Sequence, residues 1–219
     1  MQMDHIFVCV QAHAPEADAL VALGLTEGSP NRHPGQGTAN RRFFFDNAFL
    51  ELLWLADAEE AQQPLTQPTR LYERLCDTTG QISPFGVCFR PSMPDELPNF
   101  PVWQYQPGYL PASLQVDIAM DTPLAEPMWF FLGFGSRPDQ ASASKQQPLQ
   151  HSLGVKTVTA LRLTVVTQVP LSQAATAAQQ VSGVEVCVGD VPLLEISFDE
   201  EKQEQMRDFR PLMPLVLRW

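Results

Sequence analysis

The sequence has few of the features that mark nucleic-acid-binding, secreted or membrane proteins. It contains 14 Lys and Arg against 25 Asp and Glu, for a net charge of −11, and its basic residues are scattered. A chain with this balance repels polyanions. No apolar run approaches the ~20 residues of a membrane helix, and the first residues lack the basic start and apolar stretch of a secretory signal. We expect a soluble cytoplasmic protein with no nucleic-acid or membrane partner.

Cysteine is also scarce, and its spacing excludes the common metal and redox motifs. The four cysteines lie far apart, without a C-x-x-C pair. Cys9, Cys88 and Cys187 each sit in an apolar run, which favours buried reduced thiols. No Ser-His-Asp or Cys-His nucleophile arrangement can be identified. The hydrophobic content of 44% against 18% charged residues is ample for a folded core.

Regular elements are predicted at both ends of the chain, on either side of a proline-rich middle. Eleven of the 20 prolines fall between Pro84 and Pro148, where long elements are disfavoured. Hydrophobic periodicity predicts strands at 4–10, 41–45, 49–55, 85–90, 114–120, 129–134, 159–166, 184–189 and 191–199, and helices at 14–24, 69–76 and 171–183. Gly189 and Asp190 predict a hairpin turn between the last two strands. The expected organisation is a first module at 1–80, a proline-rich insert at 81–150 and a second module at 151–219.

The two ends of the chain share a weak repeat of strand, helix and strand. Each first strand has one hydrophilic residue among apolar ones, His5 or Arg162, and each last strand has a central glutamate, Glu51 or Glu195. A buried carboxylate costs several kcal/mol unless it meets a cation or hydrogen-bond donors. We therefore expect a positive group beside the two glutamates.

These patterns resemble the vicinal-oxygen-chelate superfamily (glyoxalases, bleomycin-resistance proteins and dioxygenases), and in particular its glyoxalase-like branch. The segments that carry the resemblance are DHIFV at 4–8, HPGQGTANRRF at 33–43, LELLW at 50–54 and LLEISF at 193–198. The resemblance implies an α+β fold in which two fused βαβββ-like modules form a cupped, incomplete barrel. The proline-rich insert would lie between the two modules.

The resemblance also implies a divalent metal in the cup. His5, Glu51 and Glu195 match the expected ligand positions, whereas Arg162 stands where a second histidine is expected, and a guanidinium does not ligate metals. Three ligands can still hold Mn²⁺, Fe²⁺, Zn²⁺ or Ni²⁺. The alternative is a cup without metal, in which Arg162 pairs with Glu51 or Glu195.

Two further groups of residues are candidates for contact with a ligand. The loop before the strand at 41–45 contains Gly35, Gln36, Gly37, Thr38, Asn40 and Arg41, whose amides and side chains form either an anion-binding nest or an ordinary tight turn. A second group is either pocket lining or core: Arg42, Phe44, Trp103, Tyr105, Tyr109, Trp129, Phe130 and Phe131.

Two functions remain open at this point. The first is a metal-dependent lyase, isomerase or dioxygenase that acts on a small, anionic organic molecule, with Glu51, Glu195 and Arg162 as catalytic groups. The second is a metal-free protein that binds or sequesters such a molecule. Either can be a monomer or a homodimer, because two modules in one chain complete a cup.

The acidic composition makes a direct prediction. The protein should show no affinity for DNA or RNA at 50 mM salt, because no cluster of Lys and Arg is available to release counterions. Fluorescence anisotropy with labelled duplex DNA and single-stranded RNA measures this. Binding that weakens steeply as the salt concentration rises would contradict it.

Overall fold

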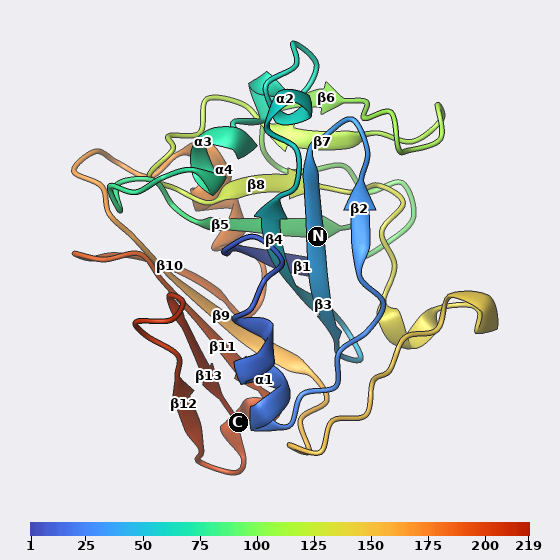
Figure 1. Ribbon diagram of the computed structural model, residues 1–219, viewed down its shortest axis with the longest axis vertical. Coiled ribbons are helices and arrows are strands. Elements are labelled where there is room, and N and C mark those ends of the chain that lie inside the picture. Colours follow the sequence, from blue (N-terminus) through green and yellow to red (C-terminus); the bar gives the residue numbers. More distant parts are fainter.

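Two β-sheets form the body of the protein, and the computed structural model describes all residues, 1–219 (Figure 1). The first sheet has eight strands in the order β2-β3-β4-β1-β5-β8-β7-β6. Its strands are β1 (Gln2–Cys9), β2 (Asn31–His33), β3 (Thr38–Phe44), β4 (Phe49–Leu55), β5 (Phe85–Arg90), β6 (Val102–Tyr105), β7 (Val116–Ala119) and β8 (Met128–Phe131). The sheet curls into a half-barrel, so the predicted α+β class with a cupped, incomplete barrel is confirmed.

The second sheet has five strands in the order β10-β9-β11-β13-β12. They are β9 (Val158–Val165), β10 (Val184–Val188), β11 (Leu193–Phe198), β12 (Met206–Asp208) and β13 (Leu215–Arg218). The helices are α1 (Ala17–Leu23), α2 (Ala58–Ala61), α3 (Leu71–Leu75) and α4 (Gln173–Ala178), with 3-10 turns at Gln67–Thr69, Pro138–Gln140, Ala143–Lys145 and Asp199–Glu201. None of the helices has the length and apolar character needed to span a bilayer.

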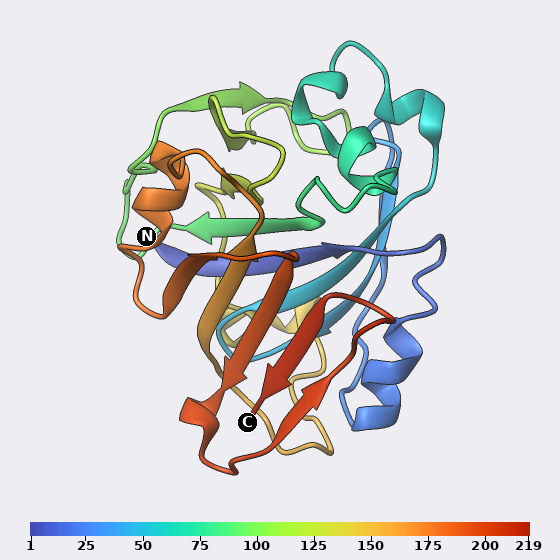
Figure 2. The ribbon, with the colours of Figure 1, turned by 90° about the vertical axis from the view of Figure 1, so that its left-hand side faces the viewer.

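The alternation of side chains along β1 divides the molecule into a core and a cup. Ile6 and Val8 are fully buried in the main hydrophobic cluster, which also contains inward-facing residues of the second sheet. His5 and Phe7 point to the opposite face, as successive residues of a strand must. Figure 2 shows the second sheet (orange to red) lying against the first sheet beside α1. One face of the first sheet is therefore packed, and its other face is free to form a cavity.

The cup is built from two halves that repeat the same strand pairing. In the first half β1 is parallel to β4, which is antiparallel to β3. In the second half β5 is parallel to β8, which is antiparallel to β7. The antiparallel pairing of β1 with β5 joins the halves. The proline-rich segment, expected to be an insert at 81–150, thus contributes four strands to the same sheet as residues 1–80.

The segment expected as the second module, 151–219, forms the separate second sheet. Its strand directions repeat those of the central cup strands, because β9 is parallel to β10 and antiparallel to β11, and β11 is parallel to β13. The hairpin predicted at Gly189 and Asp190 is wrong, since β9 lies between β10 and β11. The chain crosses over there, and the turn residues alone do not reveal the crossover.

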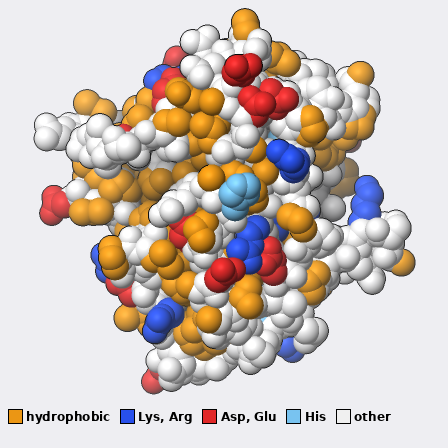
Figure 3. Space-filling view, viewed as in Figure 1, with side chains coloured by type: hydrophobic (Ala, Val, Ile, Leu, Met, Phe, Trp, Pro, Cys, Tyr) orange, Lys and Arg blue, Asp and Glu red, His pale blue; other side chains and the backbone are white.

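The face in Figure 3 shows no cluster of basic side chains, whereas acidic side chains lie next to one another near its top. Basic side chains appear singly or beside acidic ones, with hydrophobic side chains between them. Arg41 illustrates this pattern, since its guanidinium lies 2.8 Å from Asp18 and 2.6 Å from Glu27.

The contact of Phe7 with Gly86 across the β1–β5 junction can be tested by substitution. A Cβ at Gly86 would lie 2.0 Å from Cε1 of Phe7, so Gly86→Ala should lower the free energy of unfolding by ~1–3 kcal/mol through overpacking. Gly108→Ala is the control, because its Cβ would meet no atom within 4 Å. Urea denaturation measures both variants. Equal midpoints for the two would contradict the close approach of β1 and β5.

Candidate functional site

A cavity of about 280 Å³ lies in the concave side of the first sheet. Both halves of the sheet line it, but with different chemistry. Polar side chains come from the first half and from the loop before β7, namely His5, Asn31, His33, Gln36, Asn40, Arg42, Glu51 and Tyr109. The remaining lining residues are Phe7, Phe49, Leu53, Leu71, Tyr105, Leu110, Val116, Met128, Phe130, Leu132 and Phe134. The cavity therefore has a polar side and an apolar side.

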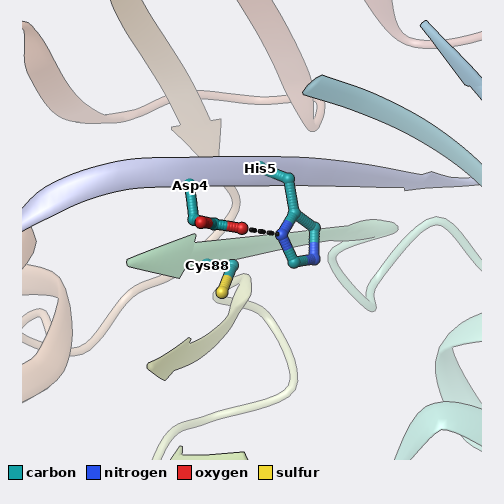
Figure 4. A group of neighbouring side chains, drawn as sticks. All are labelled: Asp4, His5 and Cys88. Atoms are coloured by element: carbon teal, nitrogen blue, oxygen red, sulfur yellow. Dashed lines mark hydrogen bonds and ion pairs between the residues drawn. The ribbon is translucent and has the colours of Figure 1, made fainter. Parts of the chain in front are cut away.

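A buried carboxylate fixes the orientation of His5 at the base of this cavity. His5 Nδ1 lies 2.7 Å from Asp4 Oδ1, and both side chains are at most 8% exposed. Neighbouring residues on a strand normally point to opposite faces, but the pairing of β1 with β5 shifts register between Met3 and His5. The bulge turns Asp4 toward the histidine ring, as Figure 4 shows. When Nδ1 donates to Asp4, Nε2 is left to face the cavity.

Glu51 faces the same part of the cavity from β4. It is 5% exposed, and its Oε2 lies 3.7 Å from His5 Nε2. Asn40, on the neighbouring strand β3, donates a hydrogen bond to Glu51 Oε1. His5 lies between two rings, with Phe49 stacked at 4.3 Å and Phe130 edge-on at 5.3 Å between centroids. The histidine and the glutamate are thus held close together with restricted rotation.

A second polar group closes one side of the cup. His33 Nδ1 lies 2.8 Å from the Thr38 hydroxyl, which also accepts a hydrogen bond from Gln36 Nε2. Tyr109 donates to Gln36 Oε1 at 3.2 Å and packs against His33 with ring centroids 4.9 Å apart. Burial lowers the pKa of His33, which the Glu51 carboxylate partly opposes. His33 is therefore a neutral hydrogen-bonding group at physiological pH.

The glycine loop does not present the anion-binding nest that the sequence suggested. The amides of Gly35 and Gly37 both donate to Glu60 Oε2, at 2.7 and 3.1 Å, so a carboxylate of the protein itself takes that position. Arg41 points away from the cup and donates to Glu27 and Asp18. Of the six residues predicted there, Gln36 and Asn40 line the cavity and Thr38 supports Gln36.

Arg162 and Glu195 do not join His5 and Glu51. Both belong to the second sheet, where Arg162 Nε lies 3.9 Å from Glu195 Oε2 and Arg218 Nη2 donates to Glu195 Oε1 at 2.8 Å. The Arg162 side chain is 55% exposed. The pairing of Arg162 with a glutamate occurs, but in a surface groove outside the cup. The two ends of the chain align as patterns yet fold into different sheets, which separates the four predicted residues.

The predicted aromatic lining is present in part. Arg42, Tyr105, Tyr109 and Phe130 line the cavity. The other members have different places: Trp129 and Phe131 are buried in the main core, Phe44 packs under Arg42, and Trp103 lines a neighbouring pocket.

One group of three potential metal ligands lies close enough together to share an ion. The ligand atoms of Asp4, His5 and Cys88 are all within 4.8 Å of one another (Figure 4). Their contacts do not favour a divalent ion. Asp4 Oδ1 is bonded to His5 and Asp4 Oδ2 faces the Arg90 guanidinium at 3.5 Å.

The metal site implied by the resemblance also lacks a complete set of ligands. Of its three ligands only His5 and Glu51 reach the cavity, and catalytic zinc sites use three protein ligands. Strands β5 and β8 bring Cys88, Met128 and Phe130 to this region, which supply no nitrogen or oxygen ligand. The ligand set implied by the resemblance is therefore incomplete in the cavity, because Glu195 is absent from it.

The positions of Asp4 and Cys88 in the site were not predictable from the residue pattern. The turn of Asp4 toward His5 depends on a bulge that no residue pattern indicates. Cys88 was expected to be buried, and it is, but its position beside His5 follows from the β1–β5 register. His33, the first residue of the segment HPGQGTANRRF, reaches the cavity because it lies on β2, the edge strand of the curled sheet.

Comparisons with known proteins agree with this geometry. Residues 3–98 match the family of the glyoxalase-like domain, which confirms the resemblance to the vicinal-oxygen-chelate superfamily. A crystal structure of a hypothetical protein from Staphylococcus aureus is similar over 99% of this chain and 98% of that chain, with a TM-score of 0.58 and 10% identity. At that identity the likeness concerns the fold alone. No curated protein matches the sequence. The matched residues include His5, Glu51 and Arg42.

The burial of Cys88 beside His5 predicts that its thiol reacts slowly with alkylating reagents. At pH 8 the thiol of Cys88 should stay protonated and unmodified by iodoacetamide in the folded protein, because burial raises its pKa. Cys76, which is exposed, should be alkylated within minutes. Peptide mass spectrometry after quenching measures both sites, with urea-unfolded protein as the control. Alkylation of Cys88 as fast as that of Cys76 would show that it is an accessible thiolate.

Proposed function

We propose that the cup binds a small organic molecule and moves a proton on it with His5 and Glu51. The supporting observation is the line Asp4–His5–Glu51, buried in a cavity whose opposite side is apolar. Matches to the glyoxalase-like domain support small-molecule binding or enzymatic activity in general.

The positions of the two side chains explain how the proton moves. His5 Nε2 and Glu51 Oε2 are both basic atoms, and at 3.7 Å they are too far apart for a strong hydrogen bond with each other. An atom of a bound molecule can contact both. A protonated imidazole there is a proton donor, and the neighbouring carboxylate is a proton acceptor, which is the pairing that general acid–base catalysis requires.

The reaction that suits this pair is enolisation. Glu51 accepts the proton from a carbon beside a carbonyl group, while His5 donates a proton to the carbonyl oxygen. The C–H electron pair becomes the C=C bond of the enol and the carbonyl π pair becomes the O–H bond, so no oxidant is needed. Return of a proton to the same carbon restores the carbonyl group and exchanges the hydrogen; if a C=C bond is conjugated with the enol, its far carbon takes the proton instead and the double bond shifts, which is an isomerisation. Asp4 is a positioning residue, because its hydrogen bond to Nδ1 directs Nε2 into the cup.

Exchange of carbon-bound hydrogen with D₂O tests the proposal. With 2-oxo-4-phenylbutyrate as probe, proton NMR should show enzyme-dependent loss of the C3 signals. Glu51→Gln and His5→Asn should each lower the rate by about 10²-fold or more, the usual contribution of one acid–base group. Glu185→Gln is the matched control, since Glu185 is exposed on β10.

Chelation separates this proposal from metal-dependent chemistry. The exchange rate should be the same with and without EDTA, because both protons move between side chains and the bound molecule. Activity that is lost on chelation and returns with Mn²⁺ or Zn²⁺ would contradict the metal-free mechanism. Exchange that persists in Glu51→Gln would contradict the role of the glutamate.

A further inference from the structure

Arg42 is a cation in the wall of the cup with unused hydrogen-bonding capacity. It is the one Lys or Arg among the residues that line the cavity. Its Nε donates to the carbonyl of Ser29 at 2.9 Å, and its guanidinium lies 5.1 Å above the ring of Phe44. These two contacts fix the plane of the guanidinium. They leave the terminal nitrogens Nη1 and Nη2 without a partner in the protein.

The adjacent residue, Arg41, differs from Arg42 because every nitrogen of its guanidinium donates to acceptors of the protein. Arg41 points to the opposite face of β3, where it makes bonds to Glu27, Asp18 and the carbonyl of Ala14. Arg42 has no carboxylate within 4.0 Å, although Glu51 is its direct cross-strand partner. Burial lowers the pKa of Arg42, which reflects a partly desolvated charge without a contacting anion. A ligand carboxylate would supply that anion and bind two parallel N–H groups.

The other charges of the cup limit the ligand to one negative group. Glu51 lies opposite Arg42 across the β3–β4 pair, and cross-strand partners have Cβ atoms about 5 Å apart. A second anionic group near Arg42 would therefore meet the Glu51 carboxylate in a low-dielectric site. A phosphate or dicarboxylate is disfavoured, whereas a single carboxylate is balanced by the guanidinium.

The rest of the cavity wall determines the polarity of the part of the ligand that lies beyond its carboxylate. Apart from the Tyr105 hydroxyl, the wall beyond His5 and Glu51 is mainly hydrocarbon, chiefly Leu53, Leu71, Val116, Met128 and Phe130. A polar group placed there would lose its hydration without finding a partner. An aryl or alkyl body would bury apolar area against these side chains.

We infer that the ligand of the cup is a hydrophobic monocarboxylate, with its carboxylate on Arg42 and its hydrocarbon body against the apolar side chains of the cavity wall. The atoms between these two ends then lie at His5 and Glu51. This inference rests on the proposed function and adds the substrate class and the residue that selects it. Arg42 takes the role that the sequence assigned to the glycine loop.

Calorimetric binding of three probes tests the inference: 3-phenylpropionate, its neutral amide and phenylsuccinate. The wild-type protein should bind 3-phenylpropionate about ten- to hundredfold more tightly than the amide, the usual effect of hydrogen bonds to a charged group. Phenylsuccinate should bind more weakly than 3-phenylpropionate because of Glu51. Arg42→Met should abolish the preference for the acid, and Arg42→Lys should retain part of it.

Arg32→Met is the matched control, because Arg32 is exposed on β2 and points away from the cup. It changes the net charge equally and should keep the full preference for the acid. Equal affinities for acid and amide, or an unchanged preference in Arg42→Met, would overturn the role of Arg42. The deuterium exchange assay reports separately on the proposed function. If exchange occurs although the role of Arg42 is overturned, the proposed roles of His5 and Glu51 stand. If none of the three probes binds and no deuterium exchange occurs, both proposals fail.

Discussion

The position of β1 between β4 and β5 is the constraint on which the site depends. Parallel pairing with β4 puts Glu51 beside Phe7, on the same face as His5. Antiparallel pairing with β5 joins the two halves of the cup, and its register shift between Met3 and His5 turns Asp4 toward the histidine ring. A one-residue slip of β1 would send His5 into the core and Ile6 into the cup, since side chains alternate along a strand. Burial of Ile6 and Val8 therefore keeps His5 on the face of β1 that Glu51 also faces.

The two halves of the cup repeat one strand pairing but divide the chemistry between them. The first half supplies the ionisable groups Arg42, Glu51 and His5, while β8 supplies Met128 and Phe130. This division is what an amphipathic ligand requires, with one polar end and one apolar end. The second sheet repeats the directions of the central strands, yet its polar face is exposed and its charges pair with one another, as Glu195 does with Arg218. A repeated topology thus yields a ligand site only where the sheet curls around a buried space.

Sequence patterns identified single polar residues on apolar strands, but they did not predict which strands pair over long distances. His5 and Glu51 were identified because each is a polar residue on an otherwise apolar strand, and such a residue needs a buried partner. The role of the proline-rich segment was not predictable in the same way, because its short strands are recognised as cup strands only through their pairing with β1. Glu195 satisfied the same local pattern as Glu51, but the choice between two sheets depends on contacts distant in sequence. The closure of the glycine loop by Glu60 is also a tertiary contact that the loop sequence does not encode.

The most direct test is to determine which ring nitrogen of His5 carries the proton. Long-range ¹H–¹⁵N NMR correlations distinguish the two imidazole nitrogens, and the spectrum of His5→Gln identifies the His5 signals among those of the four histidines. If Asp4 orients His5, the proton lies on Nδ1 and is protected from exchange by Asp4, and the Nε2 signal changes when a monocarboxylate binds. In Asp4→Asn the protection of the Nδ1 proton should be lost. A His5 ring with a bare Nδ1 and its proton on Nε2 in both proteins would contradict the central claim.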